Sequence, residues 1–486
     1  MRSEGQYVLI SGPIGADSFR TTVEAALTNT PVWDRYDRTR RRVSESLAVT
    51  ALERALDSAA FVSSFEYFAP RAGTETVALG SECGEPNEVG DLVEADALFL
   101  VEDVAICLEV KGRSVARAAR RGDVTRLKTE IKKILGHGAD QARRLESLIQ
   151  ENGGVWRADR TWLDLSQVRE THTVVAGLDY FGPLGVSLGD LDSSGLLGHG
   201  PLPWIASLHD LEVISRVVDR PAEFLLYLRR RTNSGVAKHY RGSDELDLFM
   251  LFMDGGLFVE DDPDEIHHRY PRTPPPTRTA RTRFEREARP TFVGTHTDPV
   301  DAWMYWIEGS NPDETEKPVF NVDPSAAALV DFLAAGKKPG WLRVGADLLA
   351  LSGPTQRKLA ANVERIVQRT EQDLNPHTLT QGFASTHGYL TFFARTMPPA
   401  ADRDVEASLL YTYMLTKKHQ VGSDRSFGLL LNPRGRIEAT MYMNHPSGDD
   451  EALDELGRAI GLKRTWKKPK RPPALSKKKR KRRRRR

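Results

Sequence analysis

The spacing of apolar residues predicts that the first half of the chain begins with a helix and continues as paired strands. One apolar residue every three or four positions predicts a helix over residues 44–61. A strand is expected at 61–68. Two dense apolar segments, 92–101 and 104–111, are separated by only two residues, the length of a hairpin loop. We therefore expect a helix followed by antiparallel strands.

Helical periodicity returns over residues 123–150, although Gly136 and Gly138 weaken it near the middle. The segments after it predict two strands and then three helices, at 172–178, 204–208, 210–218, 221–230 and 244–253. Residues 44–258 are therefore expected to form one α/β domain, with a mixed sheet flanked by helices. An N-terminal segment with little pattern, residues 1–43, precedes this domain.

Residues 259–295 lack sustained periodicity and contain a proline-rich stretch, so we interpret them as a linker. A second domain is expected over residues 296–460, where the apolar pattern resumes. Its predicted helices and strands lie near residues 299–307, 324–335, 353–373, 389–393, 402–419, 427–431 and 437–443. This pattern is typical of a C-terminal α+β module, and no motif in it indicates a role.

Cysteine content and hydropathy narrow the class of protein. Cys83 and Cys107 are the only cysteines, which excludes a disulfide framework or a cysteine-rich zinc cluster and fits a reducing cytoplasm. No segment approaches the roughly 18–20 uninterrupted apolar residues of a membrane helix, and no secretory signal is expected. The abundance of Ala, Arg and Asp points to a bacterial source. We expect a cytoplasmic protein that does not associate with membranes.

The formal net charge of +2 hides a strong asymmetry. Residues 463–486 contain 16 Lys and Arg and no acidic residue, whereas residues 1–462 hold 53 basic against 67 acidic residues, a net charge of −14. Fixed charge of one sign predicts a disordered basic tail over 461–486. Such a tail favours a polyanionic partner. The cations expected to contact nucleic-acid phosphates are Lys463, Arg464, Lys467, Lys468, Lys470, Arg471, Lys477, Lys478, Lys479 and Arg480.

The clearest chemical signal lies on the predicted hairpin. Side chains alternate along a strand, so Glu109 and Lys111 project from the same face of the second strand, and the other face is apolar. Burying an unpaired charge is expensive, so this pair needs a partner or a metal ion. The hairpin brings Asp96 alongside Glu109. Two carboxylates beside an ammonium group form a site for a hard cation such as Mg²⁺.

This arrangement resembles the PD-(D/E)XK nuclease superfamily of restriction-endonuclease-like fold, and its NERD-like and Mrr-like branches in particular. Glu94-Ala-Asp96 matches the first acidic motif and Glu109-Val-Lys111 matches the E-x-K motif, although the Pro-Asp pair common in the superfamily is absent. The order of predicted elements over about residues 44–180 matches the α-β-β-β-α-β core. The resemblance implies hydrolysis of phosphodiester bonds with Mg²⁺, or with Mn²⁺ as the alternative metal.

The resemblance also implies two further site residues. Many members carry a glutamate on the preceding helix, which we assign to Glu53, with Glu45 and Asp57 as weaker candidates. Several branches carry a glutamine on the following helix, matched here by Gln141 in ADQARRL, which would orient the lysine or the water. The predicted catalytic set is therefore Glu53, Asp96, Glu109, Lys111 and Gln141, of which Asp96, Glu109 and Glu53 would bind the metal, with Glu94 as a flanking residue.

Three interpretations of function remain open at this point. The first is a nuclease, with DNA the favoured substrate, acting in restriction, repair or defence. The second is a non-catalytic nucleic-acid-binding protein that keeps a nuclease-like fold, in which Glu109 and Lys111 form an ordinary ion pair. The third is a scaffold that binds a protein partner or forms an oligomer. The basic loop at 112–122 is interpreted as a contact to the nucleic-acid backbone.

Overall fold

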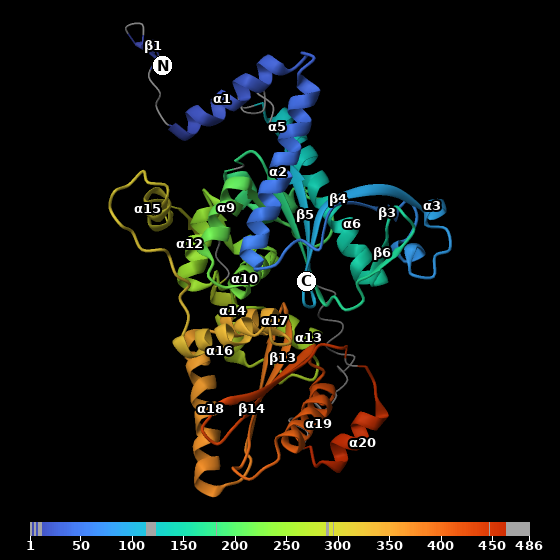
Figure 1. Ribbon diagram of the computed structural model, residues 1–486, viewed down its shortest axis with the longest axis vertical. Helices are drawn as coiled ribbons and strands as arrows, with labels where there is room; N and C mark the ends of the chain where they lie inside the picture. Colours follow the sequence, from blue (N-terminus) through green and yellow to red (C-terminus); the bar gives the residue numbers. More distant parts are fainter. Residues whose placement is uncertain are drawn as a thin grey trace, which may run out of the picture. The chain divides into compact units, whose positions relative to one another are not determined.

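The computed structural model describes residues 2–3, 6–7, 12–112, 123–180, 182–287, 291–294, 296–446 and 448–462. Contacts divide the chain into two compact units. The first comprises Met1–Glu260 and Glu285–Asn362, and the second comprises Asp261–Phe284 and the chain from Val363 onward. Both units combine helices with a β-sheet (Figure 1), so the expected α/β class is confirmed.

This division differs from the domain boundaries expected from the sequence. The interpreted linker, 259–295, contains the helices α13 (Pro263–Arg269) and α14 (Arg278–Glu287). The Asp262 side chain caps α13, which starts a helix where the apolar pattern is weak. Tyr270 packs against Tyr389, so the segment joins the second unit. Residues 285–362 belong to the first unit, although 285–295 were expected in the linker and 296–362 in the C-terminal domain.

The first unit is built on a five-stranded mixed sheet with the order β3-β4-β5-β8-β9. Its strands are β3 (Val62–Pro70), β4 (Gly90–Val101), β5 (Val104–Lys111), β8 (Glu170–Gly177) and β9 (Trp204–Ser207). The first three strands are antiparallel neighbours, and β8 and β9 run parallel to β5. Glu102 takes the left-handed conformation in the turn between β4 and β5, with a φ of 55°. The predicted hairpin is confirmed.

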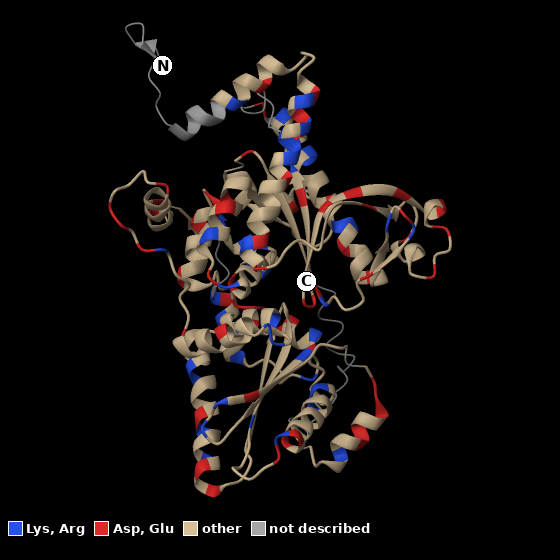
Figure 2. Cartoon of the chain, in the orientation of Figure 1, with Lys and Arg blue, Asp and Glu red and all other residues tan. Residues whose placement is uncertain are grey.

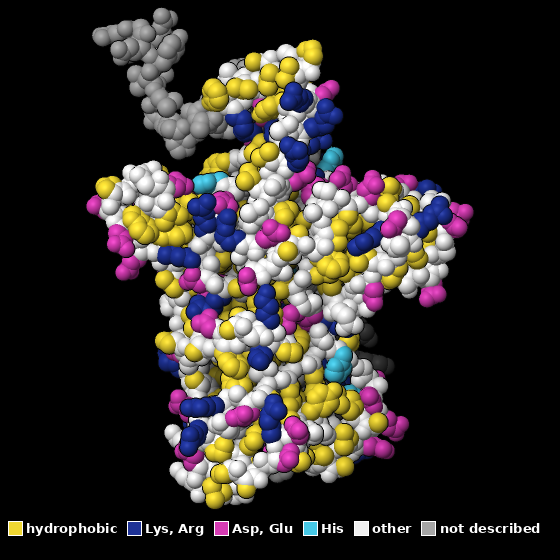
Figure 3. Space-filling model, viewed as in Figure 1, with side chains coloured by type: hydrophobic (Ala, Val, Ile, Leu, Met, Phe, Trp, Pro, Cys, Tyr) yellow, Lys and Arg dark blue, Asp and Glu magenta, His cyan; other side chains and the backbone are white. Residues whose placement is uncertain are grey.

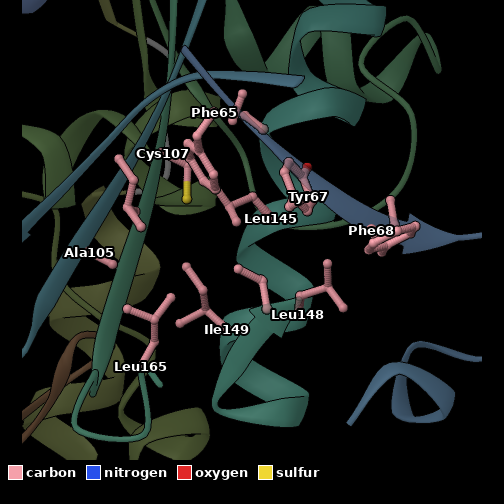
Figure 4. Close-up of a cluster of buried hydrophobic side chains, with 14 of the residues drawn as sticks. Phe65, Tyr67, Phe68, Ala105, Cys107, Leu145, Leu148, Ile149 and Leu165 are labelled. Atoms are coloured by element: carbon pink, nitrogen blue, oxygen red, sulfur yellow. The ribbon is translucent and has the colours of Figure 1, made fainter. Parts of the chain in front are cut away.

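Helices cover both faces of this sheet. The long helix α2 (Trp33–Leu56) contacts β4 and β5 through a buried stripe that includes Ala48 and Leu52. On the other face, α6 (His137–Asn152) packs Leu145 and Leu148 against the core around Cys107 (Figure 4). A π-helical turn, η2 (Lys132–Gly136), joins α5 (Val124–Ile131) to α6, at the place where glycines weaken the sequence pattern.

The remaining elements of the first unit extend this core. The residues expected to have little pattern include α1 (Gly12–Leu27) and the beginning of α2, so the first clear helix starts earlier than predicted. The other elements are β1 (Arg2–Ser3), β2 (Gln6–Tyr7), η1 (Thr76–Leu79), α3 (Pro86–Val89), β6 (Gly154–Trp156), β7 (Trp162–Asp164), α7 (Pro183–Val186), α8 (Leu188–Ser193), α9 (Leu208–Val217), α10 (Pro221–Arg231), α11 (Ser234–His239), β10 (Tyr240–Gly242), α12 (Glu245–Gly255), β11 (Thr291–Val293), α15 (Asp298–Ile307), α16 (Pro324–Ala335) and α17 (Trp341–Leu349).

The second unit contains a four-stranded sheet with the order β12-β13-β14-β15. Its strands are β12 (Thr378–Ser385), β13 (Gly388–Thr396), β14 (Arg425–Leu431) and β15 (Ile437–Met443), and its helices include α19 (Arg403–Val421) and α20 (Glu451–Ala459). The helix α18 (Gly353–Asp373) spans the boundary between the units. The predicted hairpin of β14 and β15 is confirmed. The strand β12 was not predicted, because its polar residues and Gly382 give no clear strand pattern.

Two predictions concern residues that lie outside the described part of the chain. The predicted phosphate-contacting cations between Lys463 and Arg480 lie outside the described residues, which end at Leu462. The basic loop lies outside them as well, from residue 113 to residue 122. Among the residues that are described, no helix is both long enough and apolar enough to cross a membrane.

Candidate active site

The hairpin places Asp96 beside Glu109. The ladder between β4 and β5 ends at the pair Ala97 and Leu108. Beyond it, Asp96 turns its carboxylate toward β5, and Oδ2 accepts a hydrogen bond from the backbone N–H of Val110 at 2.6 Å. The β4 strand thus separates from β5 at this point, and the Asp96 side chain replaces the missing backbone contact. The charge of Asp96 acts on Glu109, so the two carboxylates lie near each other beside the end of β5.

A strained residue lies opposite Asp96 on the neighbouring strand. Ser64 has a φ of +48°, in the left-handed region that non-glycine residues rarely adopt. The ladder between β3 and β4 skips this position, with pairs at Ser63 and Ala97 and again at Phe65 and Ala95. Backbone strain of this kind is held by surrounding structure and concentrates at functional sites. The ladder with β3 is therefore interrupted at Asp96, and the ladder with β5 ends at the neighbouring residue, Ala97.

Glu109 is a buried acid whose charge is opposed by its surroundings. Its side chain points to the same face of β5 as Lys111, and its Oε1 lies 2.7 Å from Lys111 Nζ. Burial and the charge of Asp96 together raise the pKa of Glu109 to about 7, although Lys111 counteracts both. Burial likewise raises the pKa of Asp96, against the hydrogen bond from Val110. The pair therefore gains from a nearby cation.

Lys111 is held between β5 and α6. Its Nζ donates to Oε1 of Gln141 as well as to Glu109. The helix comes this close because Gly138 has no side chain: a Cβ there would lie 2.9 Å from Val175 Cγ1 and 3.1 Å from Lys111 Cε. Gln141 follows one turn later on α6 and faces the same way. The π turn before α6 shifts the phase of the helix, a feature often found at functional sites.

The structure does not bring Glu53 to this group. Glu53 accepts a hydrogen bond from the backbone N–H of Ala60 at 3.1 Å, near the far end of α2. Glu45 lies at the rim instead: burial raises its pKa, and the charges of Asp96 and Glu94 raise it further. The two glutamates are slightly more than two turns apart, so both match the same stripe while differing by about 12 Å along the helix. Helical periodicity alone does not indicate which turn of α2 lies beside the end of β5 that carries Glu109 and Lys111.

The other acidic residues considered on the sequence lie at the edge of the site or outside it. Glu94 is exposed and stands opposite Glu66 in the ladder between β3 and β4. Its charge reaches Glu45, which keeps it in the position of a flanking residue. Asp57 is the exposed C-cap of α2. The structure therefore gathers Glu45, Asp96, Glu109, Lys111 and Gln141 around the rim.

The carboxylates of the site are the donor set available to the Mg²⁺ ion that the sequence pattern implies. Within the described ranges, no group of three or more His, Cys, Asp or Glu residues is arranged to hold a metal ion. Asp96 Oδ1 and Glu109 Oε2 have no hydrogen-bond partner among the described residues. Two carboxylates with free oxygen atoms fit Mg²⁺, which keeps several waters and takes one or two protein carboxylates together with substrate oxygens.

Asp210 is a second buried acid near this edge of the sheet, in the first turn of α9, which follows β9. It forms a capping box with Ser207 at the start of α9, with hydrogen bonds of 3.0 and 3.1 Å. Burial and the charge of Asp244 raise the pKa of Asp210 to about 7. In the unfolded chain this pKa returns to about 3.9. At a pH between these two pKa values, the Asp210 carboxyl group is protonated in the folded state and ionised in the unfolded state.

We expect this difference to make unfolding depend on pH. The stabilisation is complete below the unfolded pKa and is lost as the pH rises through about 7, so stability should fall between about pH 6 and about pH 8 by about 1 kcal/mol from this residue. Asp210→Asn should remove that part of the pH dependence. Urea denaturation at the two pH values measures it, with the exposed Asp254→Asn as the matched control. Equal pH dependence in the Asp210 variant and the control would contradict the assignment.

Comparison with known proteins adds no assignment. No family model matches the chain, and no curated protein or solved structure matches it either. Function is therefore inferred from side-chain geometry and charge.

Proposed function

We propose that the first unit is a metal-dependent nuclease of the PD-(D/E)XK type that hydrolyses phosphodiester bonds, with DNA the favoured substrate. The observation that carries the proposal is the set of contacts around Lys111. Its ammonium group bonds to both Glu109 and Gln141, while Asp96 is fixed beside them by the Val110 N–H. An ordinary ion pair on a strand needs neither the glutamine nor the second carboxylate.

The topology of the first sheet supports the same proposal. The chain passes from α2 through the antiparallel strands β3, β4 and β5 to α6, and then to β8, which pairs in parallel with β5. Leaving out the short elements between them, this order supports a restriction-endonuclease-like fold, whose core follows the order α-β-β-β-α-β. Fold alone does not establish function, so the proposal depends on the residues at the rim.

Each residue of the site has a role in the proposed hydrolysis. Mg²⁺ held by Asp96 and Glu109 would polarise a phosphoryl oxygen of the substrate. Lys111 Nζ holds the attacking water and offsets negative charge as the water oxygen bonds to phosphorus and a phosphorus–oxygen ester bond breaks. Gln141 fixes the direction of Lys111 by accepting one of its protons in a hydrogen bond. Glu45 adds a third carboxylate at the edge of the site.

Cleavage assays with Asp96→Asn test the proposal. Wild-type protein is expected to cleave plasmid, linear duplex or single-stranded DNA in Mg²⁺ and to lose this activity in EDTA. The substitution should lower the rate about 100-fold or more, because it removes a metal ligand. Asp91→Asn is the matched control, since Asp91 lies on the same strand but is exposed and pairs with Arg71. Undiminished cleavage by the Asp96 variant would contradict the proposed site.

A second candidate function is binding of nucleic acid without cleavage. It is favoured by one observation: no group of three metal-ligating residues is found in the described part of the chain. In that case wild-type protein binds DNA with strong salt dependence and releases no product in Mg²⁺ or Mn²⁺. The same assay therefore separates the two functions.

A further inference from the structure

We propose that the N-terminal half of α2 binds the phosphate backbone of a nucleic acid and leads it to the candidate active site. The proposal rests on the proposed function and adds to it a substrate-binding surface among the described residues of the first unit. The surface, called here the arginine stripe, consists of Arg35, Arg38 and Arg42. Figure 2 shows basic residues gathered along this half of α2, and Figure 3 shows them on the surface.

Helical spacing places the stripe in line with the site. Arg35, Arg38, Arg42 and Glu45 follow one another at intervals of three, four and three residues, so they share one face of α2. Successive rows lie about one turn, roughly 5.4 Å, apart along the axis. The row ends at Glu45, whose pKa responds to the charge of Asp96. The arginines thus extend outward from the rim of the sheet.

A contact at the end of β5 confirms that α2 passes close to the reactive residues. A Cβ on Gly112, the residue after Lys111, would lie 3.6 Å from Arg41 Cγ and 3.9 Å from Ser44 Oγ. The side chains of α2 between the stripe and Glu45 therefore border the strand that carries Glu109 and Lys111. A backbone bound along the stripe reaches these residues without leaving the surface of the first unit.

The stripe is chemically distinct from the arginines beside it. Arg40 pairs with Glu24 at 2.9 Å and Arg41 pairs with Asp37 at 2.6 Å, and these contacts stabilise α1 and α2. In contrast, Arg35, Arg38 and Arg42 are exposed and form no ion pair with any described residue. The three stripe arginines therefore form a local positive surface on residues 1–462, whose net charge is −14. The complementary partner is a regularly spaced polyanion, and a phosphodiester backbone has that character.

Salt-dependent binding tests the proposal independently of catalysis. The probes are a short fluorescein-labelled DNA duplex and its single strand, bound to the full chain in EDTA and followed by anisotropy across a salt series. Each phosphate contact contributes about 0.9 to the slope of log affinity against log salt on duplex DNA. Replacing all three stripe residues with Gln should reduce that slope by about 2 to 3 and weaken binding at least tenfold at low salt. Contributions from the basic tail are equal in both proteins.

Two control proteins make the result decisive. The variant with Lys238, Lys337 and Lys358 replaced by Gln loses the same charge from exposed positions elsewhere on the first unit and should keep the wild-type slope. Replacing the stripe residues with Lys should restore most of the slope, which excludes misfolding as the cause. An unchanged slope in the stripe variant, or an equal loss in the control, would overturn the proposal. Because no metal is present, this outcome is independent of whether the protein cleaves DNA.

Discussion

Lys111→Met is expected to reduce Mg²⁺-dependent DNA cleavage by about 1,000-fold, within the range seen when a charged group acting in the transition state is removed. Methionine retains an unbranched side chain that packs beside Gly138, so the helix contact is preserved. What is lost is the ammonium group that bonds to Glu109 and Gln141. Initial rates at saturating DNA, together with thermal melting to verify folding, measure the effect.

The expected loss has to come from chemistry and not from weaker substrate binding. Lys111→Met should bind DNA in EDTA within a few-fold of wild type, because one cation contributes little to a backbone held by many contacts. Lys128→Met is the matched control: Lys128 is exposed on α5, and its loss should leave the rate nearly unchanged. Cleavage by the Lys111 variant at the rate of this control would eliminate the proposed role.

The local part of the site was predictable because it depends on one hairpin and one helix. An apolar strand interrupted by Glu109 and Lys111 indicates a special face, and a two-residue turn determines which residue of the partner strand lies opposite. Gln141 was predicted from the resemblance, which implies a glutamine on the helix after the E-x-K motif. The structure brings these residues together with Asp96. In contrast, the choice between Glu45 and Glu53 depends on how far α2 extends past the sheet, which no local pattern encodes.

Contacts between distant segments were beyond the reach of sequence patterns. Glu170 begins β8, and its ionic partners Arg229 and Arg343 lie on α10 and α17. Arg343 also pairs with Asp103 in the turn of the β4–β5 hairpin, at 2.7 Å. The expected boundary at 259–295 separates Arg343 from the rest, because a proline-rich stretch resembles a linker. Residues 285–362 nevertheless belong to the first unit, and the buried ion pairs of Arg343 with Asp103 and Glu170 are among the contacts that join them to it.

Glu170→Gln is expected to destabilise the first unit by about 3–5 kcal/mol, as measured when one partner of a buried ion pair is removed. Arg229 is 1% exposed and donates to both oxygens of Glu170 at 2.7 Å, and Arg343 donates to Oε2 at 2.8 Å. These arginines hold the pKa of Glu170 well below its usual range, although burial opposes them. Glutamine keeps the size of the side chain but removes the carboxylate charge that these two buried guanidinium groups share, although each keeps one other carboxylate, Asp347 for Arg229 and Asp103 for Arg343. Urea denaturation near neutral pH measures the change.

Glu212→Gln provides the matched comparison for this prediction. Glu212 also bridges two arginines, Arg54 at 2.9 Å and Arg216 at 2.6 Å, but all three side chains are partly exposed. Water screens such pairs, so its removal should change stability by less than about 1 kcal/mol. A similar small effect at Glu170 would mean that α17 is not anchored to the hairpin through this network. A large effect confined to Glu170 would establish that residues distant in sequence hold the turn of the hairpin whose other end carries Asp96 and Glu109.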